Sequence, residues 1–136
     1  VFLSSDSWVQ VDEFVLPGKT MATHVSKIMD GLFMGTKNAG EDYNFLVMNK
    51  IGGVVNCSGS SVPNHAQTLG ICYLTFRWVD RPSSIVFDQK GRNIIRIFKF
   101  IERIRLQGEG ILLHSWDGNS RAVVACVAYL VRKFHW

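Results

Sequence analysis

Residues 110–131 read GILLHSWDGNSRAVVACVAYLV and contain three kinds of segment in order: apolar, polar and apolar again. The run Gly110–Leu113 predicts a short strand, residues 114–121 predict a tight loop, and Ala122–Val131 predicts a helix. A helix that begins directly after such a loop presents unpaired backbone N–H groups at the positive end of its dipole. Arg121 adds a planar set of donors that can hold two oxygens of one phosphate. The segment therefore predicts a phosphate-binding loop.

Ser115 is the first residue of this loop, where a nucleophile would face the bound phosphorus. A cysteine there would be ionised by the helix N-terminus and the arginine, and a thiolate is a strong nucleophile at neutral pH. A serine hydroxyl is a weak nucleophile unless a base lies beside it. His114 is adjacent in sequence, but neighbouring side chains of a strand point to opposite faces. The chain is therefore expected to bind phosphate without hydrolysing it.

The string His114–Arg121 resembles the His-Cys-x5-Arg signature of the cysteine-dependent protein tyrosine phosphatases, with Ser115 in place of the cysteine. The wider chain, from about residue 16 to residue 136, is similar to the dual-specificity branch of that superfamily. Asp30–Gly35 resembles its entry strand, Ile51–Asn56 its second strand, and residues 73–82 the loop that carries its general acid. The resemblance implies a phosphoprotein phosphatase that acts through a phosphocysteine intermediate and needs no cofactor.

The resemblance also implies a role for individual residues. Ser115 occupies the nucleophile position, Arg121 clamps the phosphate, and His114 orders the loop. Asp80 would protonate the leaving oxygen; a plain loop or N-cap aspartate is the alternative, and Asp88 is the weaker candidate for the acid. The phosphate-binding loop comprises Ser115, Trp116, Asp117, Gly118, Asn119, Ser120 and Arg121. By position, Ser120 could either contact the phosphate or cap the helix, and Arg121 could instead form a structural salt bridge.

Two further positions differ from the family pattern. Ala122 follows the arginine, where active dual-specificity members commonly carry Ser or Thr, and Asp117 places a carboxylate where a phosphate dianion would be repelled. Two hypotheses follow. The chain is either a phosphatase domain inactivated by Ser115, or a natural pseudophosphatase that binds phosphoproteins or scaffolds partners. The expected partners are proteins carrying phosphotyrosine and phosphoserine or phosphothreonine, because no counterpart of a long phosphotyrosine-recognition loop is evident.

Composition places limits on the other classes. The 136 residues fit one domain, 1–136, with residues 1–19 as a surface extension. The net charge of +4 suits an anionic ligand but is no polybasic nucleic-acid footprint. The four histidines show no metal-ligand spacing, and no apolar run reaches the length of about 18 residues that predicts a membrane span. Gly-x4-Gly-Lys-Ser/Thr and Gly-x-Ser-x-Gly motifs are absent, which excludes P-loop nucleotide hydrolases and that class of serine hydrolase.

Cysteine usage indicates the compartment. Cys57, Cys72 and Cys126 are odd in number and widely spaced, and each lies in an apolar stretch. Buried, reduced thiols are expected, in a cytoplasmic or alternatively nuclear protein. The oligomeric state is left open.

Periodicity and breakers predict the remaining elements. They are edge strands at 24–29 and 31–35, a helix at 41–50 ended by Gly52-Gly53, strands at 53–57 and 71–76, and an amphipathic helix at 92–107. This alternation predicts an α/β fold with a central, mostly parallel sheet flanked by helices. The helix 122–131 is apolar almost all round and is expected to be covered on every side. In the resembled family further C-terminal helices provide this cover, so the chain is expected to be truncated.

Overall fold

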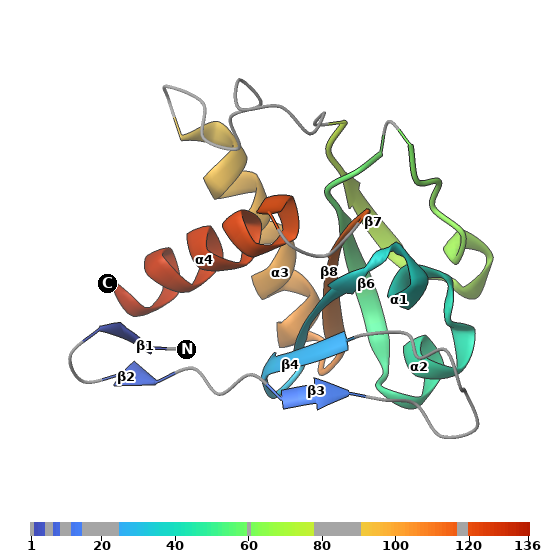
Figure 1. The fold of residues 1–136 in the computed structure, drawn as a ribbon, viewed down its shortest axis with the longest axis horizontal. Coiled ribbons are helices and arrows are strands. Elements are labelled where there is room, and N and C mark those ends of the chain that lie inside the picture. The colour runs from blue at the N-terminus through green and yellow to red at the C-terminus, as the bar shows by residue number, and fades with distance from the viewer. Residues whose placement is uncertain are drawn as a thin grey trace.

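The computed structural model describes residues 2–4, 7–8, 12–14, 25–59, 61–77, 91–116 and 120–136 (Figure 1). Its strands are β1 (Phe2–Ser4), β2 (Ser7–Trp8), β3 (Asp12–Phe14), β4 (Val25–Met29), β5 (Leu32–Thr36), β6 (Ile51–Asn56), β7 (Cys72–Thr75) and β8 (Gly110–Ser115). Its helices are α1 (Lys37–Glu41), α2 (Tyr43–Met48), the 3-10 turn η1 (Gln67–Leu69), α3 (Arg92–Leu106) and α4 (Ser120–Phe134).

A six-stranded mixed sheet forms the centre, in the order β3-β4-β5-β8-β6-β7, while β1 and β2 form a separate pair. The pairings β5–β8, β8–β6 and β6–β7 are parallel, whereas β3–β4 and β4–β5 are antiparallel. Parallel neighbours need long crossovers, which the helices supply. The predicted α/β class with its central sheet flanked by helices is therefore confirmed.

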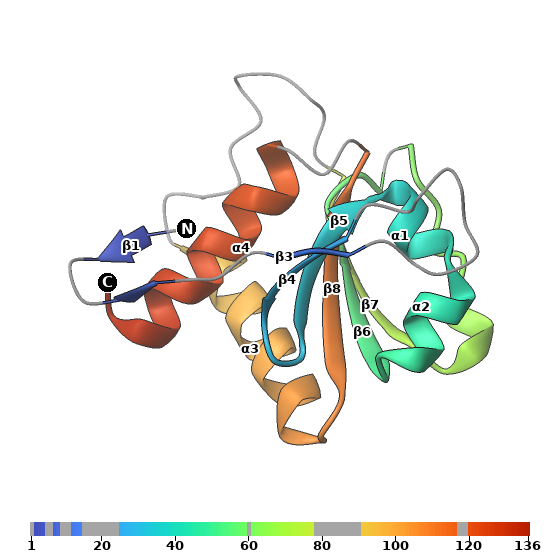
Figure 2. The same cartoon turned by 60° about the horizontal axis from the view of Figure 1, so that its bottom comes forward.

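Helices cover both faces of the sheet, as the two views in Figures 1 and 2 show. Along β8, Ile111 and Leu113 pack in the core beneath α3 and α4, and Leu112 packs in the core beneath α1 and α2. The alternation follows from the two-residue period of a strand. Because both faces are buried, β8 is apolar throughout its length rather than alternating in hydrophobicity.

The strands at the amino-terminal side of the sheet differ from expectation. Residues 24–29 and 31–35 are predicted as edge strands, but β5 lies between β4 and β8, and β3 pairs with the outer side of β4. The edge is thus supplied by residues 12–14, within the segment expected to be a surface extension. The assignment of edge strands was wrong because pairing with β8, distant in sequence, leaves no local signal in β5.

The predicted helix 41–50 is replaced by two short helices that meet at Asp42. The Asp42 carboxylate accepts a hydrogen bond from the Phe45 N–H at 3.1 Å and so caps α2, whereas α1 begins earlier, at Lys37. Gly52-Gly53 does not end a helix but lies inside β6. A Cβ atom on Gly53 would stand 2.7 Å from Ile111 Cδ1 and 2.8 Å from Ile104 Cγ1. The glycine is required because α3 approaches the sheet too closely for a side chain.

The amphipathic helix predicted at 92–107 is confirmed as α3, and a polar network joins it to α4. Arg105 Nη1 donates to the Tyr129 hydroxyl at 2.9 Å, and that hydroxyl donates to Glu102 Oε1 at 3.2 Å. Lys133 Nζ reaches the same carboxylate oxygen at 2.6 Å. Burial pushes the pKa of Glu102 up, but the contacts with Lys133, Tyr129 and Arg105 outweigh it and hold that pKa below its ordinary value.

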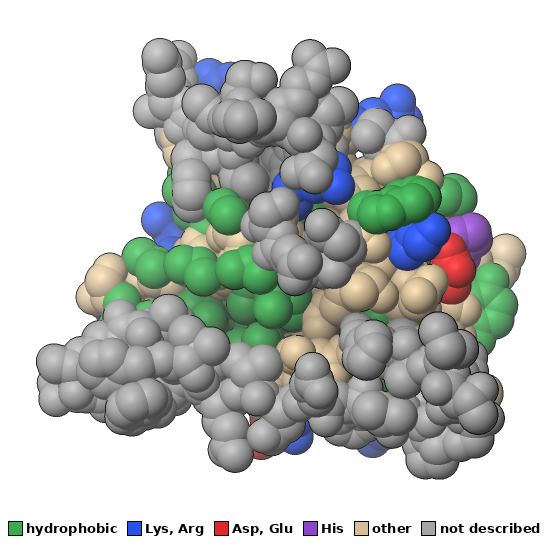
Figure 3. Space-filling model, viewed as in Figure 1, with side chains coloured by type: hydrophobic (Ala, Val, Ile, Leu, Met, Phe, Trp, Pro, Cys, Tyr) green, Lys and Arg blue, Asp and Glu red, His purple; other side chains and the backbone are tan. Residues whose placement is uncertain are grey.

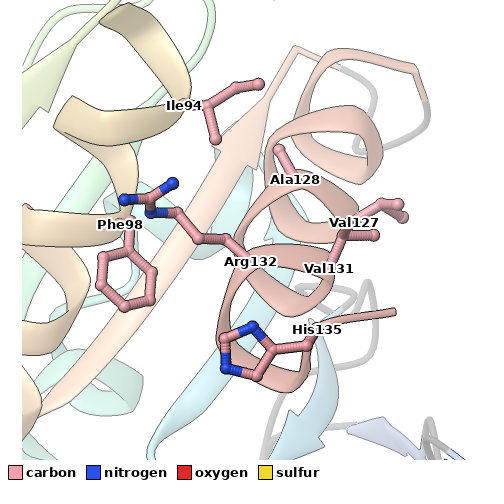
Figure 4. Close-up of a pocket in the computed structure, with 7 residues that line it drawn as sticks. All are labelled: Ile94, Phe98, Val127, Ala128, Val131, Arg132 and His135. Carbon is pink, nitrogen blue, oxygen red and sulfur yellow. The ribbon is translucent and has the colours of Figure 1, made fainter. Parts of the chain in front are cut away.

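The last helix, α4, is longer than predicted and is not covered on every side. Ala125 and Leu130 belong to the core, but Val131 is 39% exposed. Val127 and Val131 line a groove of about 540 Å³ between α4 and α3, which Arg132 and Phe98 border (Figure 4). Hydrophobic side chains gather on the visible face over α4 in Figure 3. The helix is apolar all round in sequence, yet within the described residues its packing lies on the sheet side and on the α3 side.

Two of the three cysteines are buried as expected, Cys57 and Cys126, while Cys72 is exposed. Cys72 is the first residue of β7, at the edge of the sheet order, where one side of the strand is uncovered. Across the described part of the chain, all helices are too short or too polar to cross a lipid bilayer.

Candidate functional site

The carboxyl ends of three parallel strands meet at one edge of the sheet. Thr36 of β5 is in register with Ser115 of β8, and Asn56 of β6 is in register with His114. The N–H of Cys57 extends this pairing by donating to the His114 carbonyl at 2.9 Å. In open α/β sheets ligands bind outside the carboxyl ends of the strands. This edge is therefore where a ligand is expected.

Ser115 ends β8 and is fully buried. Because side chains alternate along the strand, it shares a face with Leu113, toward α4, while His114 points to the other face, toward α1. Among the described residues its Oγ has no hydrogen-bond partner. The expectation that His114 cannot act as a base for Ser115 agrees with these opposite orientations.

Arg121 lies in the first turn of α4, six residues after Ser115. The positive charge of Arg121 acts on Cys57, which directly follows β6. Burial raises the pKa of the Cys57 thiol to about 12, and the Arg121 guanidinium opposes that rise. The guanidinium therefore lies near the carboxyl ends of β6 and β8. The structure thus brings Ser115 and Arg121 to the same edge of the sheet.

His114 is buried at 1% exposure, and its imidazole packs against Gly40 of α1. Burial, and to a lesser extent His65, lowers the pKa of His114 to about 4, so that the ring is neutral at physiological pH. Its Nδ1 atom has no hydrogen-bond partner within the described residues. Its role in ordering the loop stays a prediction.

Trp116, the first residue after the strand, is held at two points that the sequence did not reveal. Its backbone N–H donates to Ser58 Oγ at 2.9 Å, and Lys37 Nζ lies 3.6 Å from the centroid of its ring. Trp116 is 48% exposed as a whole residue. The strand pairing explains both contacts, because Thr36 and Asn56 end strands parallel to β8, so Lys37 and Ser58 follow at the same edge of the sheet.

The other predicted site residues cannot be placed in this way. Asp80, Asp88, Asp117, Gly118 and Asn119 lie outside the described residues, and Ser120 is described only as the backbone start of α4. Among the described residues, no group of three or more His, Cys, Asp or Glu side chains is arranged to hold a metal ion. The groove between α3 and α4 is lined by residues of those two helices and by His135, and not by Ser115 or Arg121.

Comparison with known proteins shows which proteins this chain is similar to. The chain matches no protein-family model. It is 32% identical over 118 residues to dual specificity protein phosphatase 22 of Mus musculus, covering 85% of this chain and 60% of that protein. The identity with the Xenopus laevis protein of the same name is 34% over 122 residues, covering 85% of this chain and 53% of that protein. The chain thus spans little more than half the length of these relatives.

The fold agrees with the sequence relationship. The crystal structure of DUSP15 superposes with a TM-score of 0.72 at 26% identity, over 82% of this chain and 67% of that one. The chain is homologous to the dual specificity protein phosphatases and forms a domain with their α/β fold.

Proposed function

We propose that this domain binds phosphate monoesters of phosphorylated proteins at the loop 115–121 and, with serine at 115, does not hydrolyse them. The observation that carries the proposal is the sequence of β8, loop and α4, in which a buried Ser115 and Arg121 lie at the carboxyl edge of a parallel sheet. A helix N-terminus and an arginine favour an anionic ligand there. Homology to dual specificity phosphatases supports phosphotyrosine and phosphoserine or phosphothreonine as the ligands.

The proposed loss of activity follows from the chemistry of the nucleophile. With cysteine at 115, the thiolate would attack phosphorus while the leaving oxygen takes a proton from Asp80, and water would then hydrolyse the phosphocysteine. A serine hydroxyl has a pKa far too high to ionise in the same place. Since the imidazole of His114 lies on the opposite face of β8, it supplies no base.

Replacement of one residue tests this proposal. The chain as given should show no hydrolysis of para-nitrophenyl phosphate above background, and Ser115→Cys should restore turnover. In that background Asp80→Asn should slow hydrolysis of an alkyl phosphate by about 10²–10⁴-fold and affect an aryl phosphate with a good leaving group much less. Equal losses for both leaving groups would contradict the role assigned to Asp80.

Natural pseudophosphatase function is the alternative, and one residue favours it. Ala122 is fully buried and follows Arg121, so a hydroxyl that would assist departure of the thiolate is missing from that position. If the Ser115→Cys protein folds and binds inorganic tungstate yet stays inert, this alternative replaces the inactivated-enzyme hypothesis. If neither protein binds tungstate, phosphate binding itself is refuted.

A further inference from the structure

The hydrogen bond from Trp116 to Ser58 fixes the point at which the loop leaves β8. Ser58 Oγ accepts the backbone N–H of Trp116 at 2.9 Å. Ser58 is fully buried although it follows the strand β6 by two residues and is polar. Trp116 is only half buried and is followed by the loop that carries the proposed phosphate contacts. The hydroxyl of a buried serine is thus bonded to the backbone N–H of the half-exposed Trp116.

Hydrogen bonds of its backbone N–H and C=O groups hold Ser58 in place. Its N–H donates to Asn56 Oδ1 at 2.9 Å, and its carbonyl accepts the N–H groups of Ser61 and Val62 at 2.9 and 2.8 Å. The Asn56 side chain is in turn fixed, because its Nδ2 donates to the Val62 carbonyl and to Asn64 Oδ1, both at 2.8 Å. The backbone from which the Ser58 hydroxyl meets Trp116 is therefore held by hydrogen bonds on both sides.

We propose that Ser58 is a positioning residue, which fixes the backbone of Trp116, where the loop proposed to bind a phosphate dianion begins. Ser58 does not touch the ligand in this scheme. The hydrogen bond that the Ser58 hydroxyl accepts restricts the backbone where β8 passes into the loop. Less conformational entropy is therefore lost when the anion binds. The inference rests on the proposed phosphate binding at 115–121, and it adds the turn 56–64 to the elements that determine affinity.

Ser58→Ala tests the anchor, with Ser61→Ala as the matched control. Ser61 belongs to the same turn and its Oγ contacts the Ser58 carbonyl at 3.5 Å, but its side chain is exposed and does not reach Trp116. Calorimetric titration of the whole chain with sodium tungstate, well below the unfolding temperature, should show an affinity about 10-fold lower for Ser58→Ala and unchanged for Ser61→Ala. Ser58→Cys has a similar volume and a weak acceptor, and it serves if the alanine variant does not fold.

Amide hydrogen exchange supplies a readout that a general loss of stability would not move. The Trp116 N–H of the unchanged chain should be protected, and Ser58→Ala should accelerate its exchange selectively while the amides of Ile111 and Leu113 in β8 keep their rates. Uniform acceleration across β8 would indicate a structural role alone and overturn the proposal. So would equal tungstate affinities.

Two further outcomes have distinct meanings. Tighter tungstate binding by Ser58→Ala would show that the anion competes with Ser58 for the Trp116 N–H, which contradicts the anchor. If the unchanged chain binds no tungstate, phosphate binding is refuted, and the exchange rate of Trp116 alone decides whether Ser58 holds the corner.

Discussion

Lowering the pH from 7 to 4.5 is expected to destabilise the fold through one buried imidazole. His114 is 1% exposed, and burial, aided by His65, lowers its pKa from 6.5 to about 4. Between these two values the unfolded chain binds a proton that the folded chain does not. Stability therefore rises with pH across this window and falls as the pH is lowered through it.

The magnitude follows from the two pKa values. A group with a pKa of 6.5 when unfolded and about 4 when folded removes about 2 kcal/mol of stability between pH 7 and pH 4.5 at room temperature. For a small domain the free energy of unfolding typically falls by about 2 kcal/mol per molar urea. Between pH 7 and pH 4.5 the urea midpoint should therefore fall by about 1 M more than it would if His114 did not titrate.

Urea unfolding of the unchanged chain and of His114→Gln at several pH values measures the effect. Glutamine does not titrate, so the urea midpoint of His114→Gln should fall by about 1 M less over this pH range. This difference is expected whatever the stability of the variant at pH 7. His135→Asn replaces an exposed histidine and should retain the full dependence. Equal slopes for His114→Gln and the unchanged chain would refute the reasoning, as would an NMR titration in which the His114 ring protonates near pH 6.5.

Two predictions concern packing. In Gly40→Ala the new Cβ would lie 2.9 Å from Nε2 of the His114 ring, so the variant should lose about 1–3 kcal/mol of unfolding free energy in chemical denaturation; an unchanged midpoint would mean that the imidazole does not pack on α1. Tyr129→Phe removes the hydroxyl that accepts from Arg105 at 2.9 Å and should cost about 1–2 kcal/mol. Tyr43→Phe removes an exposed hydroxyl bond and should cost less than about 0.5 kcal/mol; equal losses in the two tyrosine variants would contradict the role of the network between α3 and α4.

Local patterns determined several elements without help from the structure. The apolar face of α3, with Ile97, Ile101 and Ile104, recurs at helical spacing, and Gly108 ends the segment with a φ of +79°. The order of strand, loop and helix at 110–134 is likewise local, because each segment has its own composition. These features were predictable because their cause lies within a few residues of each position.

The tertiary structure decided what depends on residues far apart in sequence. Gly52-Gly53 resembles a helix stop locally, but it lies in β6, where Ile104 and Ile111 occupy the space that a side chain at Gly53 would need. Leu32–Thr36 is an interior strand because β8 pairs with it, and nothing in its own residues records that pairing. The contact of Ser58 with Trp116 spans 58 positions of sequence. Hydrophobic periodicity and secondary-structure propensity depend on residues close together in the sequence. Strand order, the close approach of helix and sheet, and the contacts around the loop arise only when the whole chain is packed.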